Sequence, residues 1–191
     1  SIATVSRVLN GNARVSLATR KKVLDAMKEL DYTPNVFARG LGLNTMKTIG
    51  IMCIDSSDIY LANAVYYLEQ ELRKHSYDSI LCCTGKDYTN KKKYLELLLS
   101  KRVDGIILAG SQFVENTDTY NNDYIINAAK DIPIVLVNGY LDAPNIYSVM
   151  CNDEIAIYNA TNLLINNGHR NIVYLYTSKS YSGMNKYAGY M

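Results

Sequence analysis

The sequence contains no apolar run close to the roughly 18 residues that a membrane-spanning helix requires. It also does not begin with the basic and then apolar segment of a secretory signal peptide. These two absences favour neither membrane insertion nor secretion. We therefore expect a cytoplasmic protein that has no membrane partner.

Motifs for catalysis and metal binding are equally scarce. Neither His75 nor His169 has a Ser, Cys or carboxylate partner in a known catalytic motif, and no glycine-rich phosphate loop is present. The four cysteines lack zinc-ligand spacing, and each lies in or at the end of an apolar run. They are Cys53, Cys82, Cys83 and Cys151. The sequence thus predicts buried, reduced thiols, no catalytic residues, no metal site and no cofactor.

Charge is unevenly distributed along the 191 residues, although the formal net charge is only +2. Residues 1–48 hold eight Lys or Arg and three Asp or Glu, whereas residues 49–191 hold twelve and fifteen. A basic segment joined to a slightly acidic one is typical of a nucleic-acid-binding head attached to a domain of another kind. Because 48% of the residues are apolar, the chain can also bury a packed core.

The first ten residues have two chemically different faces when they are drawn as a helix. Val5, Val8 and Leu9 fall on one side, which can pack on a small core. Small or polar residues and one arginine occupy the opposite side. These are Ala3, Ser6, Arg7 and Asn10. Such a face suits the floor of a DNA major groove, but an ordinary surface helix with an apolar back explains these residues equally well when they are taken alone.

A second amphipathic helix is expected over residues 17–30. Ser16 is a good N-cap, and Pro34 disfavours helix at the residue before it. Between them, apolar residues recur at helical spacing. These are Val23, Leu24, Met27 and Leu30.

After residue 48, short apolar runs alternate with helical patterns. The expected strands are 49–54, 79–84, 104–109, 132–138, 146–151 and 172–177. The expected helices are 60–75, 89–101, 119–130 and 153–167. This alternation predicts βαβ units with right-handed crossovers, and therefore a parallel sheet that is covered by helices.

Two of these helices are expected to bury an apolar stripe. In the helix at 60–75 the stripe is Leu61, Val65, Leu68 and Leu72. In the helix at 153–167 it is Ala156, Ala160, Leu163 and Leu164. The run Lys91-Lys-Lys93 is interpreted as a solvated helix face.

Several short motifs, in a fixed order along the chain, carry a family resemblance. In the first 50 residues they are Thr4-Val-Ser-Arg-Val-Leu-Asn10, Thr19-Arg-Lys-Lys-Val-Leu24, Leu30-Asp-Tyr-Thr-Pro-Asn35, Ala38-Arg39 with Leu41, and Lys47-Thr-Ile-Gly50. Val103-Asp-Gly-Ile-Ile107 and Asn167-Gly-His-Arg-Asn-Ile172 follow. No single motif is specific, but in this order and spacing they resemble the LacI/GalR family of bacterial repressors.

The resemblance implies an α/β protein with a partial, all-α helix-turn-helix head, a hinge, and a truncated parallel-sheet domain of the periplasmic-binding-protein type. The implied boundaries are 1–34 for the head, 35–47 for the hinge helix and linker, 48–168 for the first effector subdomain and 169–191 for the start of the second. Family heads begin one helix earlier, and their effector domains have two complete subdomains. We therefore expect the chain to be a fragment whose incomplete head binds DNA poorly.

For DNA binding, the resemblance makes residues 2–10 the recognition helix. Ile2, Ala3 and Arg7 take base-reading positions, where Arg7 can bond a guanine edge and the other two offer apolar contact. Further candidates, mainly for phosphate contact, are Ser1, Thr4, Ser6, Asn10, Thr19 and Arg20. The basic run Thr19-Arg-Lys-Lys22 can instead be a solvated helix start.

Residues 35–41 match the hinge helix of the family. Its DNA-contacting candidates are Asn35, Ala38 and Leu41. Leu41 matches the leucine that wedges between base pairs in the minor groove, although it can instead pack within a linker. Gly40 and Gly42 replace the small polar and basic residues that are usual there, so we expect a hinge that is more disordered than usual without DNA. Amide-exchange protection of the hinge without DNA would refute this.

Open parallel sheets bind ligands at the carboxyl ends of their strands. The segments expected there are 55–60, 84–87, 109–112, 138–140 and 151–153, and they carry the carboxylates, amides and aromatic rings that suit a sugar-like metabolite. The effector-binding candidates are Asp55, Tyr60, Asn152 and Asp153. The resemblance nominates Tyr60 as the stacking aromatic. Asp55 and Asn152 can also be helix caps, and the family's arginine ligand from the second subdomain has no clear counterpart near Ser180 and Tyr181.

The resemblance as a whole implies a repressor that binds a pseudo-palindromic, double-stranded DNA operator as a homodimer and responds to a small, polar, sugar-like effector. Two alternatives stay open: a sugar-binding protein of the periplasmic type without DNA function, and an α/β enzyme such as a sugar kinase. The basic head disfavours the first, and the missing phosphate loop disfavours the second. DNA affinity that falls steeply with salt would distinguish the repressor from both.

Overall fold

The structure is a computed structural model that describes residues 1–9, 11, 14–32, 45–114, 122–176 and 179–191. The chain divides into two compact units, Ser1–Met46 and Lys47–Met191.

The first unit contains the helices α1 (Ile2–Leu9) and α2 (Leu17–Glu29), as the sequence predicts. The Ser16 hydroxyl accepts a hydrogen bond from the backbone N–H of Thr19 at 3.3 Å and so caps α2. The two helices contact each other, and Val8 of α1 is buried. The apolar side expected for α2 is only partly covered. Val23 and Met27 are half-buried, but Leu30 is 76% exposed. The contact with the short helix α1 leaves this part of α2 open.

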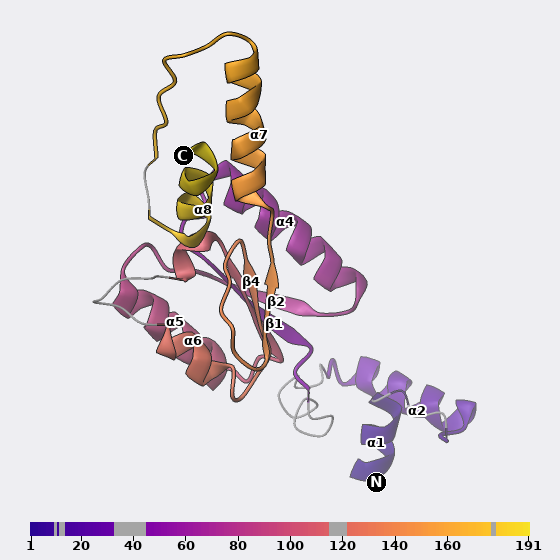
Figure 1. Cartoon of the computed structure of the whole chain (residues 1–191). Coiled ribbons are helices and arrows are strands. Elements are labelled where there is room, and N and C mark those ends of the chain that lie inside the picture. The colour runs from indigo at the N-terminus through magenta and orange to yellow at the C-terminus, as the bar shows by residue number, and fades with distance from the viewer. Residues whose placement is uncertain (10, 12–13, 33–44, 115–121, 177–178) are drawn as a thin grey trace. The chain divides into compact units, whose positions relative to one another are not determined.

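The second unit is built on a five-stranded parallel sheet, which confirms the predicted fold class (Figure 1). The strands are β1 (Thr48–Cys53), β2 (Asp78–Cys83), β3 (Gly105–Ala109), β4 (Ile134–Val137) and β5 (Ile146–Val149). Their order across the sheet is β2-β1-β3-β4-β5. Each of these strands was predicted to within two residues at its start and two at its end.

The sixth predicted strand, at 172–177, is wrong for the residues that the structure describes. Residues 171–176 form no strand, and Val173 and Leu175 are exposed. A β-strand needs a neighbouring strand that satisfies its backbone N–H and C=O groups, and none of the described strands pairs with this segment.

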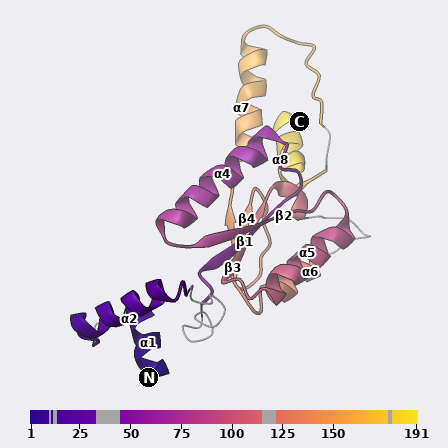
Figure 2. The ribbon, with the colours of Figure 1, turned by 180° about the vertical axis from the view of Figure 1, so that it is seen from behind.

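Helices cover the two faces of the sheet (Figures 1 and 2). The helix α4 (Ile59–Lys74) lies on one face, and α5 (Tyr88–Ser100) and α6 (Asp123–Ala128) lie on the other. The side chain of Asp58 caps α4 through the Leu61 N–H at 2.9 Å, and that of Asp87 caps α5 through the Asn90 N–H at 3.0 Å. A short 3-10 turn, η1 (Ser111–Phe113), follows β3.

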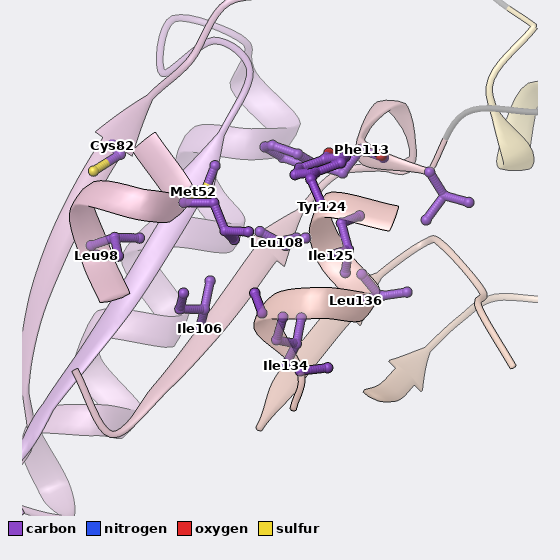
Figure 3. Close-up of a cluster of buried hydrophobic side chains, with 14 of the residues drawn as sticks. Met52, Cys82, Leu98, Ile106, Leu108, Phe113, Tyr124, Ile125, Ile134 and Leu136 are labelled. Carbon is purple, nitrogen blue, oxygen red and sulfur yellow. Dashed lines mark hydrogen bonds between the residues drawn. The ribbon is translucent and has the colours of Figure 1, made fainter. Parts of the chain in front are cut away.

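The main hydrophobic core lies between the sheet and the α5–α6 layer (Figure 3). Met52, Leu108 and Leu136 are register partners on β1, β3 and β4, and all three point into this core. Leu98 of α5 and Ile125 of α6 are buried against them. The sheet therefore gains most of its apolar burial from this side.

The lysine run of α5 differs from its interpretation as a solvated face. Lys92 and Lys93 are exposed, but Lys91 is only 1% exposed. Its ammonium donates a hydrogen bond to the backbone carbonyl of Gln112 in η1 at 2.7 Å. A lysine can be buried when its charge is hydrogen-bonded, so one of the three residues belongs to the interior rather than to the surface.

The stripes predicted for α4 and α7 (Asp153–Asn166) have different outcomes. The four α4 residues are half-buried, as a stripe that faces the sheet should be. In α7 the predicted stripe is wrong, because Ala156, Ala160, Leu163 and Leu164 are exposed.

The α7 prediction fails because this helix packs on α8 (Tyr181–Tyr190) rather than on the sheet. Ile157 and Thr161 are half-buried on the side of α7 that faces α8. The two helices approach so closely that a β-carbon on Gly189 would collide with the Glu154 carbonyl oxygen.

The cysteines also depart in part from expectation. Cys53 and Cys82 are buried, but Cys83 and Cys151 are exposed, and all four are free thiols. Cys83 lies on β2, one of the two edge strands, and its side chain is on the face opposite to that of Cys82. In the part of the chain that the structure describes, no helix is both long enough and apolar enough to cross a membrane.

Candidate functional site

The exposed face of α1 is the first candidate site. Ile2 is 91% exposed, and Ala3, Ser6 and Arg7 are exposed as well. The apolar residue Val8 is buried on the opposite side, which is the division that the periodicity predicts. The first turn of α1 carries no acidic residue, so no carboxylate there would repel a polyanion.

The other described candidates of the head lie at the helix starts. Ser1 and Thr4 share a hydroxyl hydrogen bond at 3.1 Å, and the Thr19 hydroxyl lies 2.9 Å from that of Ser16. Thr4, Thr19 and Arg20 are half-buried rather than exposed. Thr4 and Thr19 both line a hollow of about 440 Å³ between α1 and α2, so each is partly engaged within the head.

Four DNA-binding candidates lie outside the described residues. They are Asn10, Asn35, Ala38 and Leu41. The same holds for Gly40 and Gly42, so the predictions about the hinge stay predictions.

The second candidate site is the edge of the sheet where the parallel strands end. The strand termini there are Cys53, Cys83, Ala109, Val137 and Val149. The segments that follow these residues carry the predicted effector-binding side chains. We call this region the effector edge.

Asp55 forms a turn directly after β1. Its carboxylate accepts hydrogen bonds from the backbone N–H of Ser57 at 2.8 Å and from the Ser57 hydroxyl at 2.7 Å. These bonds, together with the positive charge of Lys86, hold the pKa of Asp55 below its ordinary value. Asp55 is therefore an exposed carboxylate that also has a structural role in this turn.

Tyr60, in the first turn of α4, reaches across the effector edge. Its ring is 55% exposed, and its hydroxyl oxygen accepts a hydrogen bond from the side-chain amide of Asn138 at 2.7 Å. Asn138 follows β4 and has a φ of 59°, a left-handed conformation that asparagine tolerates well. The aromatic face of Tyr60 is thus held at the edge by a residue from two strands away.

The two candidates after β5 have different surroundings. Asn152 caps α7 by accepting a hydrogen bond from the Ile155 N–H at 3.0 Å, which is the structural role that the sequence left open. Asp153 accepts a hydrogen bond from the Ser182 hydroxyl, and its carboxylate lies 3.7 Å from the Lys186 ammonium. Asp153 is therefore paired with α8.

Sequence reasoning missed the contribution of α8 to the effector edge. Ser180 caps this helix and accepts a hydrogen bond from the Ser111 hydroxyl at 3.0 Å, while Ser182 and Lys186 meet Asp153. The spacing of Ser182 and Lys186 was the available signal, because residues four apart lie on one face of a helix. Lys186 therefore brings a basic residue to this edge. It follows Ser180 and Tyr181, where the sequence showed no counterpart of the family's arginine ligand.

The structure brings the effector candidates into two groups rather than one. Tyr60 and Asn138 form the first, and Asp153, Ser182 and Lys186 form the second. The first group extends from the end of β1 to the end of β4, and the second begins after β5, the direct neighbour of β4. An aromatic face, an amide, hydroxyls and an ion pair along such an edge can hydrogen-bond a small polar ligand.

The chain matches two family descriptions over almost its whole length. Residues 46–191 match "Periplasmic binding proteins and sugar binding domain of LacI family", and residues 1–35 match "Bacterial regulatory proteins, lacI family".

Two relatives and one solved structure illustrate these matches. The chain is 63% identical over 190 residues to an HTH-type transcriptional regulator of Lachnoclostridium phytofermentans, which covers 100% of the chain and 57% of the relative. It is 34% identical over 172 residues to the HTH-type transcriptional repressor PurR of Aliivibrio fischeri, which covers 90% and 50%. The Lac repressor dimer bound to operator and the anti-inducer ONPF shares the fold with a TM-score of 0.81 at 24% identity, over 100% of this chain and 56% of that one.

Both relatives are named as regulators of transcription. The chain spans about half the length of these curated relatives.

Proposed function

Because this chain belongs to the LacI family of bacterial regulatory proteins, we propose that it is part of a DNA-binding transcriptional repressor that responds to a small polar effector. The observation that carries the proposal is the division of α1 into a buried apolar side and an exposed side. The exposed side holds Ile2, Ala3, Ser6 and Arg7 within the segment that matches the regulatory head.

On DNA, α1 would lie in the major groove as a recognition helix. Arg7 would donate to a guanine edge, and Ile2 and Ala3 would contact apolar groups such as a thymine methyl. Ser1, Thr4, Ser6, Asn10, Thr19 and Arg20 would mainly position the head on phosphates. Asn35, Ala38 and Leu41 would contact DNA from the hinge, where Leu41 would enter the minor groove. A pseudo-palindromic operator and a homodimer follow from this mode of binding.

At the effector edge, Asp55, Tyr60, Asn152 and Asp153 remain the proposed binding residues. The contacts of the structure add three further candidates, which are Asn138, Ser182 and Lys186. The match of residues 46–191 to a sugar-binding domain supports a sugar or sugar derivative as the effector. The role is binding rather than catalysis, and the protein acts in the cytoplasm.

The alternative function, a periplasmic-type sugar-binding protein without DNA activity, shares the sheet but not the head. The basic first 48 residues and the match of residues 1–35 to the regulatory family favour the repressor. The discriminating property is DNA binding that weakens steeply with salt, because each neutralised phosphate releases a counterion.

The test begins with selection of binding sites from random duplexes by the complete gene product. Fluorescence anisotropy on the selected duplex at two salt concentrations then gives its affinity. Arg7→Ala should weaken binding by about 5-fold to 150-fold and reduce discrimination against a changed base, because one base contact of about 1–3 kcal/mol is lost.

Lys28→Ala is the matched control, since it removes one positive charge from the head at an exposed position outside α1. It should lower affinity alike for all duplexes and leave base discrimination unchanged. Equal effects of the two variants on discrimination would remove α1 as the reading helix. Failure to enrich any duplex would favour the sugar-binding alternative.

A further inference from the structure

Two cysteines lie side by side at the ends of neighbouring strands. Cys53 ends β1 and Cys83 ends β2, and they are register partners in the parallel ladder. Their sulfur atoms are 3.6 Å apart. Adjacent strands lie about 5 Å apart, which is within the range that a disulfide spans between α-carbons. A sulfur–sulfur bond of about 2 Å therefore requires side-chain rotation but no rearrangement of the strands.

The backbone around this pair is held firmly. The Thr84 N–H donates to the Cys53 carbonyl at 2.9 Å, and the Gly85 N–H donates to the Ile54 carbonyl at 3.0 Å. The ladder thus continues past both cysteines. Two sulfurs that stay close have a high effective concentration for each other.

The two thiols differ in access to solvent. Cys83 is exposed, whereas Cys53 is fully buried. Cys82 is also buried, but it belongs to the core on the α5–α6 side, because successive side chains of a strand point to opposite faces. Cys83 therefore has Cys53, and not its chain neighbour Cys82, as the thiol on its own face of the sheet.

The thiols also differ in reactivity. Burial raises the pKa of the Cys53 thiol to about 12, and its hydrogen bond with Cys83 contributes to the rise. At neutral pH Cys53 therefore stays a thiol, whereas the thiolate is the form that reacts readily with an oxidant. An oxidant from solvent would meet Cys83 first, and Cys53 would react second.

We propose that Cys53 and Cys83 are a redox-modification site that forms a reversible disulfide when the protein meets a peroxide. In the first step the Cys83 sulfur attacks a peroxide oxygen: an S–O bond forms, the O–O bond breaks, and the leaving oxygen takes the Cys83 proton and departs as water or an alcohol. In the second step the Cys53 sulfur attacks the Cys83 sulfur: the S–S bond forms, the S–O bond breaks, and the oxygen leaves as water with the Cys53 proton.

In sum, two thiols give up two electrons to one peroxide, and a small dithiol such as dithiothreitol reverses the change. The bond would join β1 to β2 immediately before the turn of Asp55, and α4 would lie within the closed loop. Oxidation would therefore change the strand ends that lead into the turn of Asp55, which is part of the effector edge. This site does not depend on the proposed function, since it rests on the sheet alone.

The experiment treats the complete gene product with hydrogen peroxide, blocks the remaining thiols with N-ethylmaleimide, and maps tryptic peptides by mass spectrometry. Cleavage after lysine and arginine separates the two cysteines into peptides 48–73 and 75–86, and Cys151 into a third, 131–170. We expect the first two peptides to be joined, with two fewer free thiols per chain, and to separate after treatment with dithiothreitol.

Single variants distinguish the possible bonds. Cys82→Ser and Cys151→Ser should keep the cross-link, because neither removes a member of the pair. Cys83→Ser and Cys53→Ala should abolish it, and circular dichroism of each variant would verify that the sheet is intact. Alkylation of both Cys53 and Cys83 after peroxide, a bond confined to peptide 75–86, or a cross-link that joins two chains in a non-reducing gel would each overturn the proposal.

Discussion

The two faces of the sheet in the second unit are covered to very different degrees (Figures 1 and 2). The α5–α6 side closes a core in which α5 buries Lys91, Leu95 and Leu98 and α6 buries Tyr124, Ile125 and Ala128. The α4 side contains a longer helix, yet none of its residues is fully buried. The comparison separates two tasks. One face supplies most of the stability, while the other carries Tyr60 and borders the cysteine pair and the effector edge.

The largest expected effect is on the closed face. Leu98 is fully buried, so Leu98→Ala should lower the free energy of unfolding by about 2–5 kcal/mol through lost burial and a residual cavity. Leu72→Ala makes the same change on α4, where the side chain is half-buried, and should cost about 1 kcal/mol. Urea unfolding of both variants measures the difference. Equal losses would mean that the two faces contribute alike.

Glycine-to-alanine substitutions test the same comparison by adding a methyl group on each face of the sheet instead of removing side-chain atoms. A β-carbon on Gly50 would lie 2.7 Å from Leu98 Cδ1, so Gly50→Ala should overpack the α5 side and cost about 1–3 kcal/mol. At Gly105 the nearest atom would be 3.4 Å away, an ordinary contact on the α4 side. Gly105→Ala should change stability by less than about 1 kcal/mol. Thermal unfolding of the two variants would contradict this if Gly105→Ala were the more damaging.

Substitution of the buried Lys91 tests whether its bond to the turn after β3 contributes to the stability of the closed face. Lys91→Met keeps the length of the side chain but removes the donor to the Gln112 carbonyl, so it should cost about 1–2 kcal/mol. Lys92→Met is the control, because Lys92 is exposed and its ion pair with Glu96 is long at 4.0 Å, so its effect should stay within about 0.5 kcal/mol. Urea unfolding decides; a neutral Lys91→Met would show that the buried charge contributes nothing net.

The sequence predicted the sheet well because its three inner strands, β1, β3 and β4, are mainly apolar runs that are largely buried. Such runs identify a parallel sheet without any knowledge of its neighbours. The predicted ends were less accurate, by up to two residues. The failures concern partners rather than patterns: residues 172–176 pair with none of the described strands, and the predicted stripe of α7 is exposed.

The candidate site was predictable only at the level of the edge. Tyr60 and Asp153 lie along that edge, where they were expected; Asn138 was expected there only as part of the segment 138–140, and Ser182 and Lys186 were not named as candidates. Their roles depend on contacts over 78, 29 and 33 residues of sequence, which periodicity cannot reveal. Lys91 was misread for the same reason, since nothing in a run of three lysines tells which of them faces inward.

The last effect appears only in alkaline solution and concerns the α4 side. The pKa of Cys53 is raised from 9.0 to about 12 by burial and by its bond with Cys83, so the folded protein keeps this thiol neutral where the unfolded chain ionises it. Its contribution to stability is therefore complete below pH 9 and is lost as the pH rises towards 12. Under reducing conditions, Cys53→Ala should flatten the alkaline fall in unfolding free energy, whereas the exposed Cys151→Ala should leave it unchanged. An identical alkaline profile for wild type and Cys53→Ala would show that the thiol ionises freely in the folded state. Solvent would then reach the end of β1 on the α4 side.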